Sequence, residues 1–284
     1  MSSKQEEVVE LTLTTDGIEK TVRTTLEFQR FVDRAAAFVK DLMTVGQQCD
    51  ATTSSCPIIV GVVGGAGSGK STFCEILCAR LSGAQWNLPA VTIGMDGYHF
   101  PNAYLEPHGL MSKKGSLETI NSSAIRSDFS QFSRPFTKMQ AQRLSVVAGD
   151  DVHTNTLSAG SVLTFPMYDR NLHDPVQDKI TVDLDRHKVV LFEGLHLLSN
   201  DQDDWEAIRA LFHGLIVLQV PVCVCEERVV QRKMLGGKSE SSARSHWLRT
   251  DLKIHEQIHA DIASLRETAA DSIPPTLTYK YPSP

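Results

Sequence analysis

The sequence predicts an α/β protein built on a doubly wound parallel sheet, and three observations lead to this fold class. A β-branched apolar run at residues 58–63 leads into a glycine-rich loop, and a helical pattern follows from residue 70. Two further apolar runs, at residues 189–192 and 215–220, have the length and composition of buried strands. Helical patterns separate the runs, and such alternation is typical of parallel strands joined by crossover helices.

The loop after the first run matches the phosphate-binding pattern G-x-x-x-x-G-K-[ST], the P-loop. Glycine has no Cβ, so the chain can wrap closely enough for successive N–H groups to point at one phosphate. The following helix adds the positive end of its dipole. Lys70 is expected to reach the β- and γ-phosphates of a nucleoside triphosphate, and Ser71 to ligate Mg²⁺. The alternative is a glycine-rich turn that binds nothing.

The composition is that of an ordinary soluble globular protein. The chain has 284 residues, is 41% hydrophobic and 22% charged, and carries a net charge of −6. This balance argues against a nucleic-acid surface, and no apolar run approaches the roughly 18 residues of a membrane span. We therefore expect a cytoplasmic protein with neither a nucleic-acid nor a membrane partner. The six cysteines lack zinc-finger spacing, so reduced structural thiols are favoured over a metal or disulfide role.

An amphipathic helix is predicted before the first strand. Apolar residues recur every three or four positions between Leu26 and Met43, and the pattern ends near Gly46. Residues 47–55 have the composition of a polar linker, so residues 1–56 form an N-terminal helical extension. We expect the apolar face of the helix to cover an edge or a face of the sheet.

Acidic side chains follow two of the predicted strands. Asp96 comes after the strand at residues 88–95, and Glu193 ends the run at 189–192. Because strand C-termini in an open parallel sheet face the ligand crevice, Asp96 can accept a proton from a hydroxyl that attacks the γ-phosphate. Glu193 has the form of a Walker B carboxylate, which orients the Mg²⁺ shell. The alternative interpretation is that Asp96-Gly97 forms an ordinary turn and that Glu193 is one of the acids that often end buried strands.

Two helical patterns, at residues 122–132 and 137–148, precede a polar cluster at residues 164–174. Pro166 and Pro175 make this cluster a poor central strand. A surface loop is its ordinary interpretation. In a phosphoryl-transfer protein it becomes a candidate substrate wall, formed by Tyr168, Asp169, Arg170 and His173.

Arg228 and Arg232 lie four positions apart on a predicted helix at residues 226–233 and share one face. A solvated charged face is one interpretation. The other is a lid at about residues 225–250 that brings positive charge to a transferring phosphoryl group, with Gly236-Gly237 as a hinge. The tail at residues 274–281 alternates enough to add a short edge strand.

In this order, the P-loop, Asp96-Gly97-Tyr98-His99-Phe100, Tyr168-Asp169-Arg170, the strand ending in Glu193-Gly194 and the Arg228/Arg232 region resemble the phosphoribulokinase and uridine kinase family of P-loop kinases. Bacterial pantothenate kinase and plant glycerate kinase also belong to that family. The resemblance covers about residues 57–265 and is nearest to an uncharacterised nucleoside-kinase-like branch. It implies the P-loop-containing nucleoside triphosphate hydrolase fold for residues 57–284, with a helical lid.

The resemblance also implies roles for individual residues. The residues implied for ATP are Gly64, Gly65, Ala66, Gly67, Ser68, Gly69, Lys70, Ser71 and Thr72, with Arg228 and Arg232 from the lid. The catalytic set is Asp96 as base with Lys70, Arg170 and Glu193, and Ser71 and Glu193 hold Mg²⁺. The substrate set is Tyr98, His99, Lys113, Lys114, Tyr168, Arg170 and His173. The two lysines open a segment that resembles a basic-Gly-x-Pro-x-Thr motif, with Leu117 in place of the proline.

The sequence therefore predicts an ATP-dependent kinase that transfers the γ-phosphate to a hydroxyl of a small metabolite of the nucleoside, pantothenate, glycerate or sugar type. The competing hypothesis is a P-loop ATPase or switch that acts on a protein partner. No N-K-x-D or T-K-x-D motif is present, which disfavours a GTPase. Residues 81–85 resemble a transporter signature but lie too near the P-loop, and Gly83 fits a helix C-cap better. The sequence leaves open whether the protein forms a homodimer.

Overall fold

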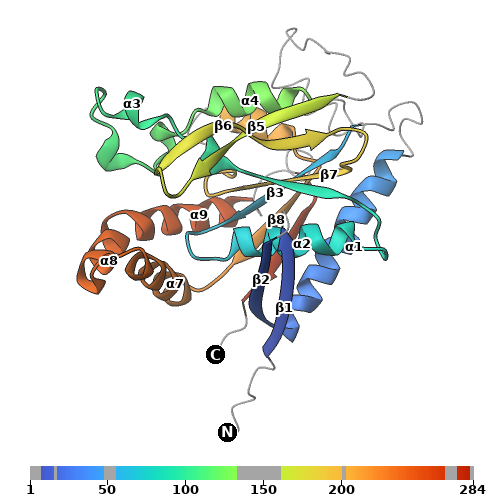
Figure 1. Cartoon of the computed structure of the whole chain (residues 1–284), viewed down its shortest axis with the longest axis horizontal. Helices are drawn as coiled ribbons and strands as arrows, with labels where there is room; N and C mark the ends of the chain where they lie inside the picture. Colours follow the sequence, from blue (N-terminus) through green and yellow to red (C-terminus); the bar gives the residue numbers. More distant parts are fainter. Residues whose placement is uncertain are drawn as a thin grey trace, which may run out of the picture.

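The computed structural model describes residues 8–15, 18–47, 56–132, 161–199, 203–265 and 274–281, and a five-stranded parallel sheet lies at its centre (Figure 1). The strand order is β4-β7-β3-β8-β9. In that order the strands span Ala90–Gly94, Val189–Gly194, Ile58–Gly64, Gly214–Gln219 and Thr276–Lys280. The predicted parallel sheet is confirmed, and the predicted tail strand is its edge strand.

Helices cover both faces of this sheet because side chains of a buried strand alternate between the faces. In β3, Ile58, Val60 and Val62 join one core cluster, whereas Ile59 and Val63 join the other. The first cluster is covered by α1 (Leu26–Gln47) and α2 (Lys70–Ser82). The second is covered by α4 (Ser122–Ser130), α6 (Asp203–Ala210) and α9 (Leu252–Ser264).

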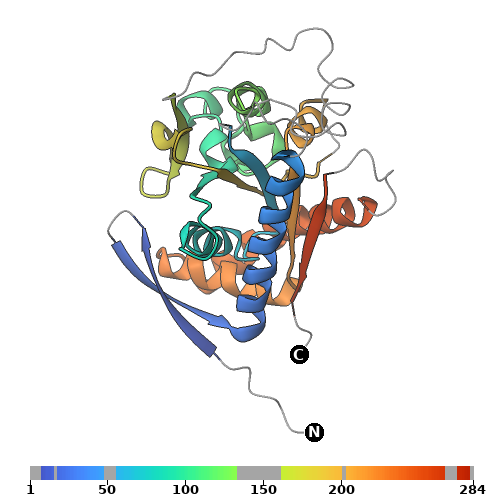
Figure 2. The same cartoon turned by 90° about the vertical axis from the view of Figure 1, so that its right-hand side faces the viewer.

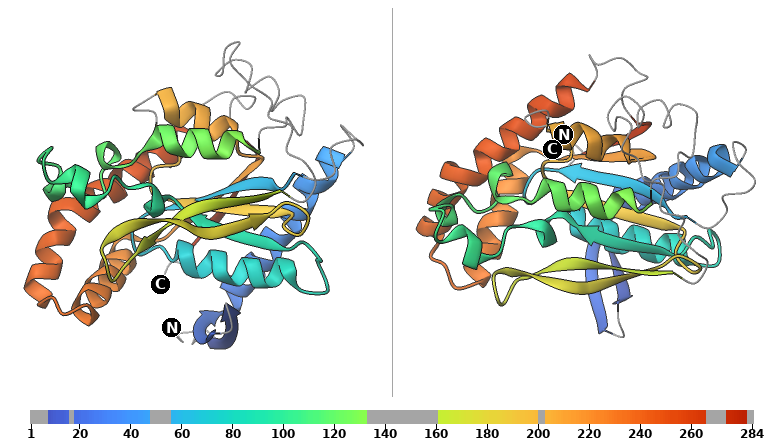
Figure 3. Two further views of the ribbon diagram at one scale, coloured as in Figure 1. Left: turned by 45° about the horizontal axis from the view of Figure 1, so that its top comes forward. Right: turned by 90° about the horizontal axis from the view of Figure 1, so that it is seen from above.

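The polar cluster at residues 164–174 belongs to a hairpin, which corrects its interpretation as a loop. The hairpin pairs β5 (Val162–Asp169) with β6 (Asp174–Asp183). Pro166 is tolerated because β5 has a single partner strand and the proline lies at a register shift in the pairing. The hairpin runs beside β4 and contacts the 3₁₀ turn η1 (Met95–Tyr98) (Figure 3).

The connection between η1 and α4 contains three short helical turns. They are α3 (Asn102–Leu105), η2 (Met111–Lys113) and η3 (Leu117–Thr119). An isolated antiparallel bridge between His99 and Ile120 ties the two ends of this connection together. The segment is therefore held close to η1 rather than extending freely over the surface.

The N-terminal extension contains a hairpin that the sequence prediction missed. Strands β1 (Val8–Thr15) and β2 (Ile18–Thr25) pair antiparallel and lead into α1 (Figure 2). Helix α1 is the helix that the sequence predicted. Leu11 and Val22 pack against the cluster formed by α1, α2 and the sheet. The predicted role of the helix in covering the sheet is confirmed, because Phe31, Val32 and Val39 are fully buried there.

The predicted lid region consists of α7 (Val222–Leu235), α8 (Glu240–His246) and a π-helical turn, η5 (Trp247–Asp251), which runs into α9. Arg244 on α8 donates to Glu226 on α7 at 2.9 Å. Trp247 and buried residues of α7 form one cluster, and Ala66 of the P-loop packs against it. These helices therefore lie directly against the nucleotide-binding loop.

Several sequence predictions lie outside the described ranges: the helix at residues 137–148, most of the linker and Cys49. Over the ranges that are described, no disulfide is present, and Cys74 and Cys225 are buried whereas Cys223 is exposed. Gly83 ends α2 as predicted, with its N–H on the Arg80 carbonyl. No described helix combines the length and the hydropathy needed to cross a lipid bilayer.

Candidate functional site

The P-loop adopts a conformation that its glycines make possible. Gly67 and Gly69 have φ angles of +79° and +88°, which side chains with a Cβ rarely adopt. A Cβ on Gly67 would lie 2.5 Å from the backbone carbonyl oxygen of Cys225 on α7. The loop thus packs tightly against α7, and α2 begins immediately after it.

Lys70 is the first residue of α2, and its ammonium group donates to the carbonyl oxygens of Gly64 at 2.9 Å and Gly65 at 3.1 Å. Desolvation lowers the pKa of Lys70, while Glu193 and Asp96 oppose this shift. Desolvation also raises the pKa of Glu193, opposed by Lys70 and by a hydrogen bond from the Ser71 hydroxyl. These interactions place both predicted metal ligands, Ser71 and Glu193, together beside the lysine.

The two predicted strand-end carboxylates come from neighbouring strands. In the β4–β7 pairing, Gly94 is opposite Glu193, and Asp96 follows two residues later. A Cβ on Gly94 would lie 3.9 Å from Glu193 Oε1. Since β3 flanks β7 on its other side, the P-loop, Glu193 and Asp96 occur in this spatial order along one edge of the sheet.

Three arginines approach this edge from other elements. Arg170, in the turn after β5, has a guanidinium nitrogen 4.0 Å from Asp96 Oδ2. On α7, the pKa of Arg232 is lowered by desolvation and then by the positive charge of Arg170, while Asp251 and Asp96 oppose the shift. Arg228 donates to the Gly67 carbonyl at 3.2 Å and lies over the Tyr281 ring. Two like charges held near one carboxylate form an arrangement that an anion would stabilise.

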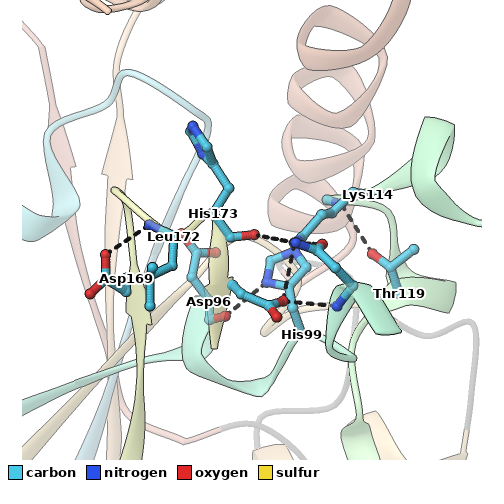
Figure 4. Close-up of polar contacts among 10 residues, drawn as sticks. Asp96, His99, Lys114, Thr119, Asp169, Leu172 and His173 are labelled. Carbon is cyan, nitrogen blue, oxygen red and sulfur yellow. Dashed lines mark hydrogen bonds and ion pairs between the residues drawn. The ribbon is translucent and has the colours of Figure 1, made fainter. Parts of the chain in front are cut away.

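His99 lies beside Asp96 (Figure 4), and Tyr168 is close enough to Asp96 to feel its charge. His99 Nδ1 is 2.8 Å from the Asp96 carbonyl oxygen, and the His99 ring centroid is 5.5 Å from that of Tyr168. Desolvation raises the pKa of Tyr168, and the negative charges of Asp96 and Asp174 raise it further. These two predicted substrate residues are therefore brought together next to the predicted base.

The two predicted substrate lysines already have partners within the protein. Lys114 donates to Asn102 Oδ1 and to the His173 carbonyl oxygen, both at 2.6 Å, and its ammonium lies 3.7 Å from Asp174 (Figure 4). Lys113 pairs with Glu118 at the surface. His173 has a positive φ of 51° and an exposed side chain. Lys114 thus ties the β5–β6 turn to α3, and its predicted contact with substrate stays a prediction.

Tyr98, which the sequence analysis also assigns to the substrate set, lies mostly in the core. Its side chain is 3% exposed and belongs to the core beneath η1. Its hydroxyl donates to Asp128 Oδ2 on α4 at 2.9 Å. The Tyr98 side chain therefore packs in the core, and its hydroxyl already has a partner within the protein.

His196 was not singled out from the sequence, although it follows Glu193 by only three residues. Its ring is 6% exposed, and Nε2 lies 3.0 Å from the carbonyl oxygen of Gly115. Desolvation lowers the pKa of His196, and the hydrogen bond to Gly115 opposes this shift. The charge of Asp96 also raises the pKa slightly, whereas His99 and Lys70 lower it. Its position after a strand ending in an acid was the signal that could have identified it.

The ring of His255 on α9 packs against Gly65 of the P-loop. A Cβ on Gly65 would lie 2.2 Å from His255 Nδ1, so only glycine fits there. The His255 ring is 1% exposed, and neither of its nitrogens has a hydrogen-bond partner in the part of the chain that the structure describes. Desolvation, His259 and Lys70 together lower its pKa to about 4.

We expect His255 to destabilise the fold in acid. Because its pKa falls from an ordinary 6.5 to about 4 on folding, the unfolded chain binds more protons between these values. Stability contributed by the neutral ring is complete above about pH 6.5 and is lost as the pH falls towards 4, on the order of 2–3 kcal/mol. Urea unfolding at pH 7.5 and pH 5 should show a smaller difference for His255→Gln than for wild type. The exposed His108→Gln serves as control, and an unchanged difference in His255→Gln would contradict the prediction.

The site fits a triphosphate and a hard cation on its own chemistry. The Ser68 hydroxyl is buried within the P-loop and has no hydrogen-bond partner among the described residues, which a phosphate oxygen would supply. Ser71 and Glu193 offer the oxygen donors that Mg²⁺ prefers. The described residues contain no cluster of three or more His, Cys, Asp or Glu that could hold a metal alone.

Comparisons with known proteins identify sequence relatives. No family model matches the chain. It is 31% identical over 189 residues to the uncharacterized protein YggC of Escherichia coli, covering 65% of each chain. It is 34% identical over 145 residues to a pantothenate kinase of Xanthobacter autotrophicus, covering 50% of this chain and 36% of that one. A candidate uridine kinase of Schizosaccharomyces pombe is 26% identical over 180 residues, which cover 63% of this chain and 68% of that one. The chain spans less than two thirds of the first two relatives.

Solved structures show the same relationship. A candidate fructose transport system kinase from Silicibacter has 28% identity and a TM-score of 0.58, covering 79% of this chain and 93% of that one. A D-glycerate 3-kinase from Cryptococcus neoformans, at 14% identity, shares the fold with a TM-score of 0.57 over 87% and 94% of the two chains. The predicted resemblance is confirmed: the chain is related to pantothenate and uridine kinase-like proteins and has the P-loop kinase fold.

Proposed function

We propose that the chain is an ATP-dependent kinase that transfers the γ-phosphate to a hydroxyl of a small molecule. The observation that carries this proposal is that Lys70, at the start of the helix after β3, interacts with Glu193 at the end of β7 and Asp96 just after β4. A P-loop alone serves many nucleotide-binding proteins. A carboxylate one strand beyond the Walker B position adds a base at the place where an acceptor hydroxyl would meet the γ-phosphate.

In the proposed reaction, the acceptor oxygen forms a bond to the γ-phosphorus, the β–γ bridging P–O bond breaks and ADP leaves. Asp96 takes the proton of the attacking hydroxyl. Lys70 exchanges its contacts with the Gly64 and Gly65 carbonyls for the β- and γ-phosphates. Arg170 and Arg232 offset the charge on the transferring group. Mg²⁺, held by Ser71 and Glu193, would neutralise phosphate charge.

The test compares ADP production by the purified chain with Mg²⁺ and ATP, alone and with a panel of small hydroxyl compounds. We expect at least one compound to stimulate ADP release and to yield its phosphate ester in equal amount. An ATPase or switch that acts on a protein partner would give the same slow ADP release with every compound. Names of the relatives suggest nucleosides, pantothenate, D-glycerate and sugars as the first panel.

A further inference from the structure

One buried side chain beside the P-loop has no hydrogen-bond partner. The ring of His255 is 1% exposed, and both of its nitrogens lack a partner among the described residues. Buried polar groups are normally paired, because an unpaired one loses its hydrogen bonds to water and gains none in return. The position of His255 is explained if a partner becomes available when the neighbouring loop binds its ligand.

The orientation of the ring identifies that partner. A Cβ built on Gly65 would lie 2.2 Å from His255 Nδ1 and 2.9 Å from Cε1, so the Nδ1 edge of the ring is the closer one. One further bond length places Nδ1 within about 3.7 Å of the Gly65 Cα. The carbonyl group of Gly65 is bonded to that Cα. Because glycine has no Cβ, the following peptide can rotate and bring its oxygen towards Nδ1 at little steric cost.

The Gly65 carbonyl changes partners during the reaction proposed above. Its oxygen accepts from the Ser68 N–H at 3.1 Å and from the Lys70 ammonium at 3.1 Å, which uses both of its acceptor positions. A bound triphosphate draws the Lys70 ammonium to its β- and γ-phosphates, so one acceptor position loses its donor. Gly65 is buried, and this loss costs free energy unless another donor takes the place of the lysine.

Packing holds the His255 ring in place for this role. The ring stacks on that of His259 with centroids 4.4 Å apart, and the Trp247 ring lies 6.2 Å away. Trp247 belongs to the cluster that includes residues of α7, and Lys233 on α7 donates to Asp251, the residue before α9. These contacts fix α9 against the lid helices. The ring can therefore donate to Gly65 with little loss of side-chain entropy.

We propose that His255 is a positioning residue for the nucleotide: when Lys70 turns to the phosphates, the Nδ1–H of His255 donates to the Gly65 carbonyl in its place. This proposal rests on the nucleotide binding of the kinase function proposed above. A neutral imidazole carries a proton on one nitrogen, so the ring can donate without a change of charge. The exchange compensates the loop for the loss of Lys70 and thereby strengthens ATP binding from a residue that touches no phosphate.

The first test uses two substitutions whose side chains branch at the same carbon. His255→Leu removes both ring nitrogens, whereas His255→Asn keeps an amide donor near the position of Nδ1. Without nucleotide, leucine replaces an unpaired polar group by an apolar one, so we expect a melting temperature at or above that of wild type. With Mg²⁺, we expect the Kd for ATP to rise about 2- to 12-fold in His255→Leu, the loss of one hydrogen bond, and to stay within about twofold in His255→Asn.

The two measurements, thermal unfolding and calorimetric titration with ATP, distinguish this role from a purely structural one. A structural histidine would give the reverse pattern, a lower melting temperature and an unchanged Kd in His255→Leu, and that result would overturn the inference while the kinase function stands. Equal rises of Kd in both variants would overturn it as well. If the wild-type chain binds no ATP, the kinase function itself is wrong and the inference falls with it. The exposed His108→Leu is the control and should alter neither quantity.

The second test observes the ring directly in the wild-type protein. Two-dimensional ¹H–¹⁵N spectra report which nitrogen of an imidazole carries the proton, and the signals absent from His255→Asn are those of His255. Saturation with Mg²⁺ and a non-hydrolysable ATP analogue should give a protonated Nδ1 whose proton shifts downfield, as expected for a new hydrogen bond to a carbonyl oxygen. Signals of His255 that stay unchanged at saturation would contradict the proposal.

Discussion

Asp96→Asn is expected to lower kcat for phosphoryl transfer by about 10²- to 10⁴-fold while the Kd for ATP stays within about twofold. The amide cannot take the proton of the attacking hydroxyl, but it preserves the size of the side chain. Asp96 contacts Arg170 at 4.0 Å and His99 through its backbone carbonyl, and its interaction with the P-loop is limited to the effect of its charge on Lys70. Single-turnover product formation and isothermal titration with ATP measure the two quantities separately.

The control for this variant is Asp185→Asn, which changes an exposed carboxylate in the turn after β6 and should alter neither quantity. If Asp96→Asn abolishes ATP binding, the carboxylate is part of the nucleotide site and its role as base is refuted. If kcat is unchanged, deprotonation of the acceptor does not depend on Asp96 and the mechanism must be rewritten around another group.

Gly67→Ala is expected to weaken ATP binding at least about tenfold. A residue with a Cβ at φ +79° is strained by about 1–2 kcal/mol, and the new methyl would lie 2.5 Å from the Cys225 carbonyl oxygen. Because that contact is with backbone, relief requires the loop to move away from α7, which disrupts the phosphate cradle. Titration with ATP and thermal unfolding should both show the effect.

Gly236→Ala provides the matched control because Gly236 has an ordinary φ of −81° and a Cβ there would lie 3.4 Å from its nearest neighbour. We expect its ATP affinity and melting temperature to remain close to wild type. Wild-type ATP affinity in Gly67→Ala would contradict the prediction, since it would mean that the loop binds phosphates in a different conformation.

Much of the fold followed from local patterns. Apolar runs of strand length, one glycine-rich loop and helical spacing in between predicted the parallel sheet and the P-loop at its centre. The neighbouring positions of Asp96 and Glu193 also followed, because parallel strands end on the same edge of a sheet. The hairpin at residues 164–174 could not be predicted from local patterns, since the effect of Pro166 depends on whether β5 has one partner strand or two.

Side-chain roles around the acceptor were harder to predict. Tyr98 and His99 are adjacent in the sequence, yet one enters the core and bonds to Asp128 while the other lies beside Asp96. Lys114 was expected to contact substrate, but α3 and the β5–β6 turn supply its partners from 12 to 59 residues away in the chain. His255 lies against Gly65 because tertiary packing brings α9 to the P-loop, 190 residues away in the chain. None of these contacts has a local pattern that encodes it.

The sequence by itself determined the nucleotide half of the predicted site. A P-loop is one continuous segment whose glycines and lysine act through short-range backbone geometry, so its chemistry can be read from eight consecutive residues. Only the tertiary structure decided the acceptor half. Asp96, Arg170, His196 and Arg232 come from four separate elements, and whether each is free to meet a substrate or is already engaged depends on packing between those elements.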